Sequence, residues 1–198
     1  MNTERIFYLV IIAVLLFITG LLYANDGNFL RQNYHNSITD LSGGDYIRFV
    51  FIGSHTCPFS NNERTHDMVN YLKKKFEEIT KEHSLKFIST GISVDIFPQL
   101  GLNYLKQTNP YHEIIAGASV YNLGSVYYSA GSPSTPRVLI LHENYETELK
   151  GINLNHLNRS QRLVQEYSGV FEIERFFNFV KSSTHEELID FLDIYTSH

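Results

Sequence analysis

A single cysteine, Cys57, is the residue of this chain best suited to covalent chemistry. It lies in the polar turn Ser54-His55-Thr56-Cys57-Pro58-Phe59-Ser60, between an apolar run and a long amphipathic segment. A thiolate is a nucleophile that a helix N-terminus or a nearby cation stabilises, so this position favours a reactive thiol. His55 would favour the thiolate if it were protonated, whereas His66 is expected to face elsewhere.

Two other interpretations of Cys57 remain open. Free cysteines often behave as small buried hydrophobes, although the polar neighbours in this turn argue against deep burial. One cysteine with His55, and with His112 or His142, would be an incomplete ligand set for copper. We predict no metal site and no cofactor, and the lone cysteine excludes an intramolecular disulfide.

The elements around Cys57 predict a βαβ unit. Tyr46–Ile52 is a β-branched and aromatic run typical of a buried strand. Residues 61–81 carry an apolar stripe at helical spacing, made by Met68, Leu72, Phe76 and Ile79. Leu85–Val94 is predicted as the next strand, parallel to the first and joined by a right-handed crossover.

The second half of the chain is predicted from weaker patterns. In the middle segment we expect short helices over Phe97–Lys106 and Leu123–Tyr128 and a strand at Glu113–Ala116. Arg137–Leu141 and Glu146–Ile152 are predicted as a hairpin that turns at residues 142–145. Beyond Gly151 the apolar spacing predicts helices to the end, with a capping-box pattern at Thr184 to Glu187.

The tyrosines of the middle segment allow two interpretations. They either pack in an enlarged core, which is the more common use of such residues, or line a partner groove beside Cys57. The tyrosines concerned are Tyr104, Tyr111, Tyr121, Tyr127 and Tyr128.

The order of these features resembles the thioredoxin-like superfamily from about Tyr46 to Val180. The shared features are a strand, a Cys-x-x-Ser turn, a long helix, a strand, a variable insert, a Thr-Pro strand, a hairpin and a terminal helix. The resemblance implies an α/β thioredoxin-like fold: a central mixed sheet flanked by helices. An expanded insert at about 96–133 and extra C-terminal helices would be added to it.

The resemblance also implies roles for individual residues. Cys57 matches the attacking cysteine of the family, and Pro136 matches a cis-proline that faces it. Thr135 matches the residue whose backbone pairs with bound polypeptide, and Ser60 stands where the resolving cysteine would be. The remaining turn residues His55, Thr56, Pro58 and Phe59 would contact substrate.

Ser60 separates this chain from the two-cysteine members of that superfamily. A serine hydroxyl can donate a hydrogen bond to a thiolate but cannot attack a disulfide, so exchange would stop at a mixed disulfide until an external thiol arrives. Cys-Pro-Phe-Ser also resembles the Cys-Gly-Phe-Ser of monothiol glutaredoxins, in which glutathione helps to hold an iron–sulfur cluster. Pro58 replaces that glycine, which leaves iron–sulfur or copper handling as a minor alternative.

The N-terminal residues predict that the domain is exported and anchored to a membrane. Ile6–Tyr23 is an apolar run of about eighteen residues, closer to a spanning helix than to a signal peptide, although cleavage after Ala24 remains open. We therefore expect a signal-anchor or signal peptide over 1–25, a tether over 26–44 and a thioredoxin-like domain over 45–198. The domain is expected on the extracytoplasmic, periplasmic side, or free there after cleavage.

Two functions fit these features. The first is an exported monothiol oxidoreductase whose client is an exported protein or a low-molecular-weight thiol, with mixed-disulfide, isomerase-like or client-capture chemistry. The second is a redox-inactive binding or assembly module within a cell-envelope complex. A net charge of −5 gives no basic patch for nucleic acid, so we expect no nucleic-acid partner.

Overall fold

The computed structural model describes residues 14, 34–37, 43–128, 134–146 and 158–196. The predicted leader over 1–25 lies outside this part of the chain, apart from Val14. Among the described residues, no helix has the length and apolar character needed to cross a membrane. Within the segment predicted as a tether, Tyr34–Ser37 form the short strand β1.

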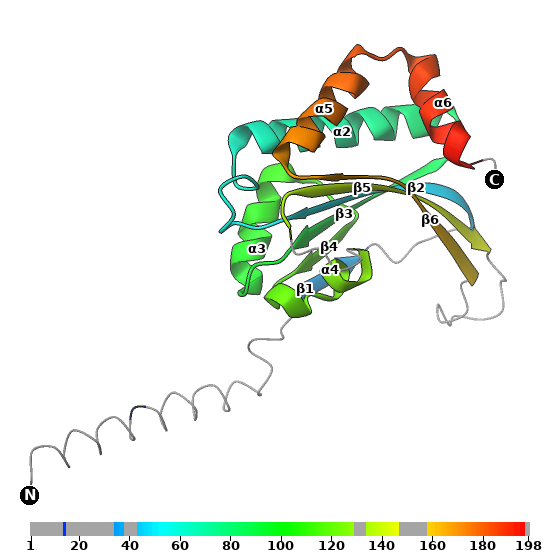
Figure 1. The fold of residues 1–198 in the computed structure, drawn as a ribbon. Helices are drawn as coiled ribbons and strands as arrows, with labels where there is room; N and C mark the ends of the chain where they lie inside the picture. Colours follow the sequence, from blue (N-terminus) through cyan, green and yellow to red (C-terminus); the bar gives the residue numbers. More distant parts are fainter. Residues whose placement is uncertain (1–13, 15–33, 38–42, 129–133, 147–157, 197–198) are drawn as a thin grey trace, which may run out of the picture.

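A six-stranded mixed sheet runs through the molecule in the order β1-β4-β3-β2-β5-β6 (Figure 1). Its remaining strands are β2 (Gly44–Gly53), β3 (Lys86–Ser93), β4 (Glu113–Ala116), β5 (Arg137–Glu146) and β6 (Asn158–Ser168). β2, β3 and β4 are parallel neighbours, whereas β5 is antiparallel to both β2 and β6. The predicted βαβ unit is confirmed by the parallel β2 and β3.

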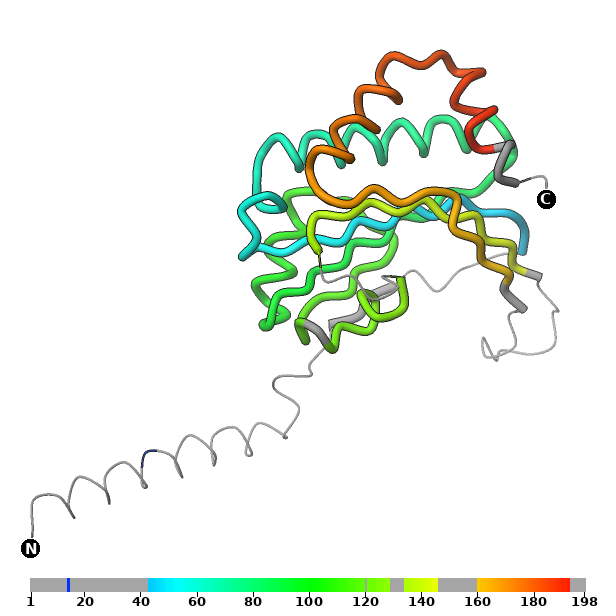
Figure 2. The backbone as a smooth tube through the Cα atoms, in the orientation of Figure 1, coloured from blue at the N-terminus to red at the C-terminus, as the bar shows by residue number. Residues whose placement is uncertain are grey.

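Helices cover the sheet unequally. α2 (Glu63–Glu82), α5 (Val170–Ser182) and α6 (His185–Thr196) lie together over one face, as the tube in Figure 2 shows. Shorter helices follow β3 and β4: α3 (Pro98–Leu105), η2 (Lys106–Thr108), η3 (Ser119–Tyr121) and α4 (Leu123–Tyr128). In Figure 1, α4 lies on the side of the sheet away from α2.

The main core lies between the sheet and the three long helices. Alternate residues of β2 face it, namely Ile47, Phe49 and Phe51, and all three are fully buried. The predicted stripe of α2 is confirmed, since its four members are at most 2% exposed. α5 and α6 add Ile173, Phe176, Val180, Leu188 and Leu192. This core holds β2 and α2 on either side of the Cys57 turn.

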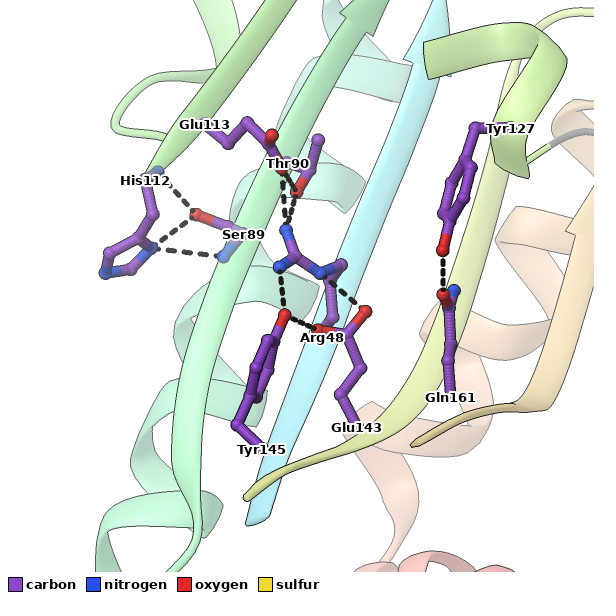
Figure 3. Close-up of polar contacts among 9 residues, drawn as sticks. All are labelled: Arg48, Ser89, Thr90, His112, Glu113, Tyr127, Glu143, Tyr145 and Gln161. Atoms are coloured by element: carbon purple, nitrogen blue, oxygen red, sulfur yellow. Dashed lines mark hydrogen bonds and ion pairs between the residues drawn. The ribbon is translucent and has the colours of Figure 1, made fainter. Parts of the chain in front are cut away.

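The opposite face of β2 carries a buried charge network (Figure 3). The Arg48 guanidinium donates to Glu143 (2.9 Å), Glu113 (2.7 Å), Thr90 (2.6 Å) and the Tyr145 hydroxyl (3.1 Å). Tyr145 in turn donates to Glu143 at 2.7 Å, and Glu143 is fully buried. The Arg48 side chain therefore links β2 to β3, β4 and β5.

The predicted hairpin is wrong in its position. β5 does not turn at residues 142–145 but continues to Glu146, because Glu143 and Tyr145 are held in the strand by Arg48. β6 occupies Asn158–Ser168, where the sequence pattern predicted a helix. The predicted strand beyond Glu146 lies outside the described residues.

Candidate functional site

The Cys57 turn is a compact loop that precedes α2 rather than the first turn of that helix. α2 begins at Glu63, and the side chain of its N-cap, Asn62, accepts from the Arg64 N–H. The Cys57 carbonyl accepts from the N–H groups of Ser60 (3.1 Å) and Asn61 (2.8 Å). The expectation that Cys57 lies beside the first free N–H groups of the helix is therefore wrong, and the backbone groups that lower the pKa of Cys57 belong to Ser60 and Phe59 in the turn.

The structure brings Cys57 and the Thr135–Pro136 segment together. The Cys57 thiol donates to the Thr135 carbonyl oxygen at 3.4 Å, and the Thr135–Pro136 peptide bond is cis, as the resemblance implied. Pro136 is buried and its carbonyl accepts from the Gly169 N–H at 2.8 Å, which ties this segment to the end of β6. Cys57 is a free, partly exposed thiol with a fixed backbone neighbour.

The environment of Cys57 lowers its pKa. Burial opposes this by raising the pKa, but hydrogen bonds from the Thr135 and Ser60 side chains and from the Ser60 and Phe59 backbone together outweigh it. The result is a larger thiolate fraction at neutral pH than an ordinary cysteine has. No histidine is needed for this shift.

Ser60 is close enough to Cys57 for its side chain and its backbone to lower the pKa of the thiol. Its side chain is fully buried, and within the described part of the chain its Oγ has no hydrogen-bond partner by strict geometry. The hydroxyl is therefore available to a thiolate at Cys57. Its carbonyl accepts from the Tyr104 hydroxyl at 3.2 Å, and a Cβ at Gly53 would meet that hydroxyl at 2.1 Å. Gly53 thus leaves the space that lets Tyr104 support the turn from below.

Asp95 organises the residues before Cys57 and was missed by the sequence analysis as a site residue. It is 2% exposed and accepts from the hydroxyls of Ser54 (2.8 Å) and Ser93 (2.6 Å). It also accepts from the backbone N–H groups of His55 (2.9 Å) and Thr56 (3.3 Å). A serine–serine–aspartate pattern at two strand ends was the available signal, because the ends of parallel neighbours meet at one edge of a sheet.

The other predicted turn residues divide into two kinds. Pro58 and Phe59 are exposed, with 64% of Phe59 accessible, and Thr56 is exposed beside Ser54. The His55 ring contacts the Asn61 amide at 3.3 Å, and none of the contacts described for it reaches the sulfur.

His66 also departs from expectation, because it is buried against Tyr104 beneath the turn. Its ring centroid lies 5.6 Å from that of Tyr104. Burial lowers the pKa of His66, and contacts with Ser60, Asp67 and Glu63 oppose this only in part.

The copper set considered from the sequence does not assemble. His142 pairs with Asp45 at the start of β2, whereas Cys57 follows the end of that strand. His112 Nδ1 accepts from the Ser89 N–H at 3.1 Å, away from the turn (Figure 3). In the described part of the chain, no three His, Cys, Asp or Glu side chains form a ready metal-binding cluster.

The tyrosines of the middle segment mostly support the packing interpretation. Tyr104 is 1% exposed in the main core. Tyr127 is exposed but bonds to Gln161 at 2.7 Å, and Gln161 pairs with Glu143 near the start of β2 (Figure 3). Tyr127 is therefore remote from the end of β2 where Cys57 lies. The exposed apolar residues of the turn and of the segment that follows Asp95 include Phe59, Ile96 and Leu100.

Comparison with known proteins identifies no family model and no curated protein that matches this sequence. Among solved structures it is similar to StoA from Bacillus subtilis, with a TM-score of 0.36 and 9% identity over 75% of this chain and 96% of that chain. It is also similar to copper-bound ScoI from Arabidopsis thaliana, with a TM-score of 0.35 and 14% identity over 69% and 83% of the two chains. Copper-bound yeast Sco1 gives a TM-score of 0.34 and 14% identity over 70% and 78%. Likenesses this low assign no activity, metal or partner.

The fold is thioredoxin-like on its own geometry. β2, α2, β3, β5, β6 and α5 occur in this order along the chain, with α3, β4 and α4 inserted between β3 and β5. Their strands lie in the order β3-β2-β5-β6. The cysteine follows β2, and a cis-proline before β5 places its neighbour's carbonyl against the sulfur. This arrangement confirms the α/β mixed sheet flanked by helices that the sequence predicted.

Proposed function

We propose that this thioredoxin-like protein acts on thiols or disulfides through the single nucleophile Cys57. The contact that carries the proposal is the one between the Cys57 sulfur and the Thr135 carbonyl, at a partly exposed turn. The lowered pKa of Cys57 supports it, because the thiolate is the species that attacks a disulfide.

The proposed reaction is one step of thiol–disulfide exchange. The Cys57 thiolate attacks one sulfur of a client disulfide, forms a mixed disulfide with it and releases the other client sulfur as a thiolate. A different thiolate of the client can then attack the client sulfur and restore the Cys57 thiolate, which rearranges the disulfides of the client. Alternatively, one external low-molecular-weight thiol attacks the Cys57 sulfur and releases the reduced client, and a second one restores the Cys57 thiolate and leaves as the external disulfide.

A second thiol is needed because Ser60 stands where a resolving cysteine would be. Its hydroxyl can stabilise the thiolate before attack and as the leaving group afterwards, but it cannot displace the client. The protein is therefore proposed to hold its client until another thiol arrives.

We place this activity outside the cytoplasm, on a domain anchored by residues 6–23. The support is the apolar run in the sequence, which lies outside the described residues. The proposed clients are exported proteins or low-molecular-weight thiols, within or near a cell-envelope complex.

The proposal is tested with the full chain and glutathione disulfide, by intact-mass measurement. Wild-type protein should gain one glutathione, and Cys57→Ser should gain none. Ser60→Cys should lose the adduct again and become two hydrogens lighter than its dithiol form, because the new thiolate can displace glutathione. A wild-type chain that gains no glutathione under conditions where an unfolded control does so would contradict the proposal.

A binding module is the second candidate, favoured by the exposed apolar side chains of Phe59, Ile96 and Leu100 beside the turn. Client capture by the variants Cys57→Ser and Phe59→Ser distinguishes the two functions. Capture of a client by Cys57→Ser that is lost in Phe59→Ser would favour binding without redox chemistry. Capture that depends on Cys57 and is reversed by reductant would favour exchange.

A further inference from the structure

Large apolar side chains are exposed on the loops that hold Cys57. Phe171 is 79% exposed, the largest exposed fraction of any large apolar side chain in the described part of the chain. Phe59 is 64% exposed and Ile96 is 47% exposed, and we call these three residues the apolar rim. Scattered apolar side chains on a surface need no explanation, whereas a group of them at one place marks a contact surface.

The loops that carry the apolar rim leave the sheet at one edge. Gly53 at the end of β2 pairs with Ser93 at the end of β3. Arg137 at the start of β5 pairs with Ile52 of β2 on one side and with Ser168 at the end of β6 on the other. Since paired residues lie side by side, all four strands meet this edge, where α2 and α3 lie at the left of Figure 1.

Each member of the apolar rim is close in the sequence to a group that holds the Cys57 site. Ile96 follows Asp95, whose carboxylate accepts from two backbone N–H groups of the Cys57 turn. Phe171 lies two residues after Gly169, whose N–H donates to the carbonyl of the cis-proline. The third member belongs to the turn itself. The rim therefore surrounds the thiol along the edge of the sheet.

The chain also enters the sheet at this edge, because Tyr34, the first residue of β1, pairs with the last residue of β4. About ten residues separate Tyr34 from the apolar run Ile6–Tyr23, which is the anchor of the proposed function. Contact of the rim with the same bilayer is then an intramolecular event at high effective concentration, so that a weak affinity for lipid is sufficient.

We propose that the apolar rim inserts into the lipid surface and holds the Cys57 thiol at the level of the headgroups. This inference rests on the membrane anchor of the proposed function. Apolar side chains gain free energy when they leave water for the boundary of the acyl chains. Lipid suits side chains that project from three separate loops, because acyl chains can surround each one, whereas a folded partner would need a pocket for each.

The test uses the absence of tryptophan from the chain, so that one introduced tryptophan reports only its own surroundings. The full chain is inserted into phosphatidylcholine vesicles with or without bromine on the acyl chains, where bromine quenches a tryptophan that reaches them. Phe171→Trp and Phe59→Trp should each lose most of their emission in the brominated vesicles. Both positions are exposed, so the larger ring needs no space in the core.

Phe179→Trp is the matched control. Phe179 is also an exposed phenylalanine of α5 and lies roughly 12 Å farther along that helix than Phe171. Its emission should be the same in both kinds of vesicle.

Three outcomes would overturn the proposal: equal quenching at all three positions, no quenching at 59 and 171, or a chain that does not sediment with vesicles. Emission at 59 and 171 that is shifted to shorter wavelength but not quenched would also overturn it, because a protein partner would then cover the rim. The readout involves no thiol chemistry, so its failure is distinct from a failure of the glutathione test of Cys57.

Discussion

At the scale of single residues, the lowered pKa of Cys57 is caused by neutral polar neighbours rather than by a charged partner. The lowering contributions come from hydroxyl and backbone groups of Thr135, Ser60 and Phe59. Because the two side-chain groups are neutral, substitution of Ser60 or Thr135 leaves no buried charge behind. The site therefore lends itself to substitution experiments in which the fold is retained.

Ser60→Ala should raise the pKa of Cys57, since one of the hydrogen bonds that favour the thiolate is lost. We expect alkylation of Cys57 by iodoacetamide at mildly acidic pH to slow several-fold, with little change in stability, because the Ser60 hydroxyl lacks another partner among the described residues. Ser182→Ala, at an exposed hydroxyl of α5, should leave the pH profile unchanged. An unaltered profile in Ser60→Ala would show that this hydroxyl does not act on the sulfur.

Asp95→Asn should loosen the turn that carries Cys57. Five donors converge on this carboxylate, and an amide offers one acceptor oxygen and places its own donors against the others. We expect a loss of about 2–3 kcal/mol in the free energy of unfolding, measured with urea. Limited proteolysis near His55 should also accelerate, and a loss below about 0.5 kcal/mol would contradict the assigned role.

Residue types predicted part of this site and could not predict the rest. Cys57, Thr135, Pro136 and Ser60 came from short motifs whose spacing is local. Asp95 could not be recognised in the same way, because its partners belong to another strand and meet it only when β2 and β3 align. His66 was misplaced because it lies outside the predicted apolar stripe and is covered by Tyr104 of α3, which is distant in the sequence.

At the scale of elements, the ion pairs of Arg48 with Glu113 and Glu143 help to hold the strands of the sheet together. Arg48→Met should destabilise the protein by about 3–5 kcal/mol, since it leaves the fully buried Glu143 without its cation. The urea midpoint should fall accordingly. The double variant Arg48→Met/Glu143→Leu should recover part of the loss, because the uncompensated charge is removed as well.

Lys81→Ala provides the comparison for Arg48→Met. It breaks an exposed ion pair with Glu77 one helical turn away and should cost about 0.3–0.5 kcal/mol. Equal losses in the two variants would mean that burial of the Arg48 network adds nothing.

The two elements that failed prediction, β5 and β6, each depend on strand pairing that the local sequence does not reveal. β6 contains a bulge, where the pairing steps from Ile140–Gln165 to Leu141–Leu163 and skips Val164. A bulge interrupts the two-residue alternation of a strand, and the spacing of Leu163, Val164 and Tyr167 then imitates a helix. β5 continued past its predicted end because a buried Glu143 is tolerated only beside Arg48, a partner on another strand.

At the scale of the whole molecule, stability should depend on pH in two opposite ways. Burial lowers the pKa of Lys73 to about 8, so between about pH 8 and 10 the unfolded chain binds a proton that the folded chain lacks. The free energy of unfolding should rise in that window, by on the order of 1–2 kcal/mol. Below pH 8 both states hold the proton and the contribution is constant.

Above about pH 10 the direction reverses. Burial raises the pKa of Tyr104 and of Tyr111, so these phenols stay neutral in the folded protein while those of the unfolded chain ionise from 10.0 upwards. The folded state then binds more protons, and stability falls as pH rises.

Urea unfolding from pH 7 to 11 should therefore show a maximum near pH 10. Lys73→Met should remove the rising limb and keep the falling one. A rising limb that persists in Lys73→Met would assign it to another group.

The position of β1 has a geometric consequence for where the thiol can work. Tyr34 pairs with Ala116, Ala116 with Ser93 and Ser93 with Gly53, so the chain enters the sheet at the same end from which the Cys57 turn leaves. If Ile6–Tyr23 spans a bilayer as proposed, only about ten residues separate it from β1. Fully extended, they reach roughly 35 Å. This short connection would keep the Cys57 sulfur close to the lipid surface. Clients whose cysteines lie near the membrane would therefore be favoured over clients that diffuse freely.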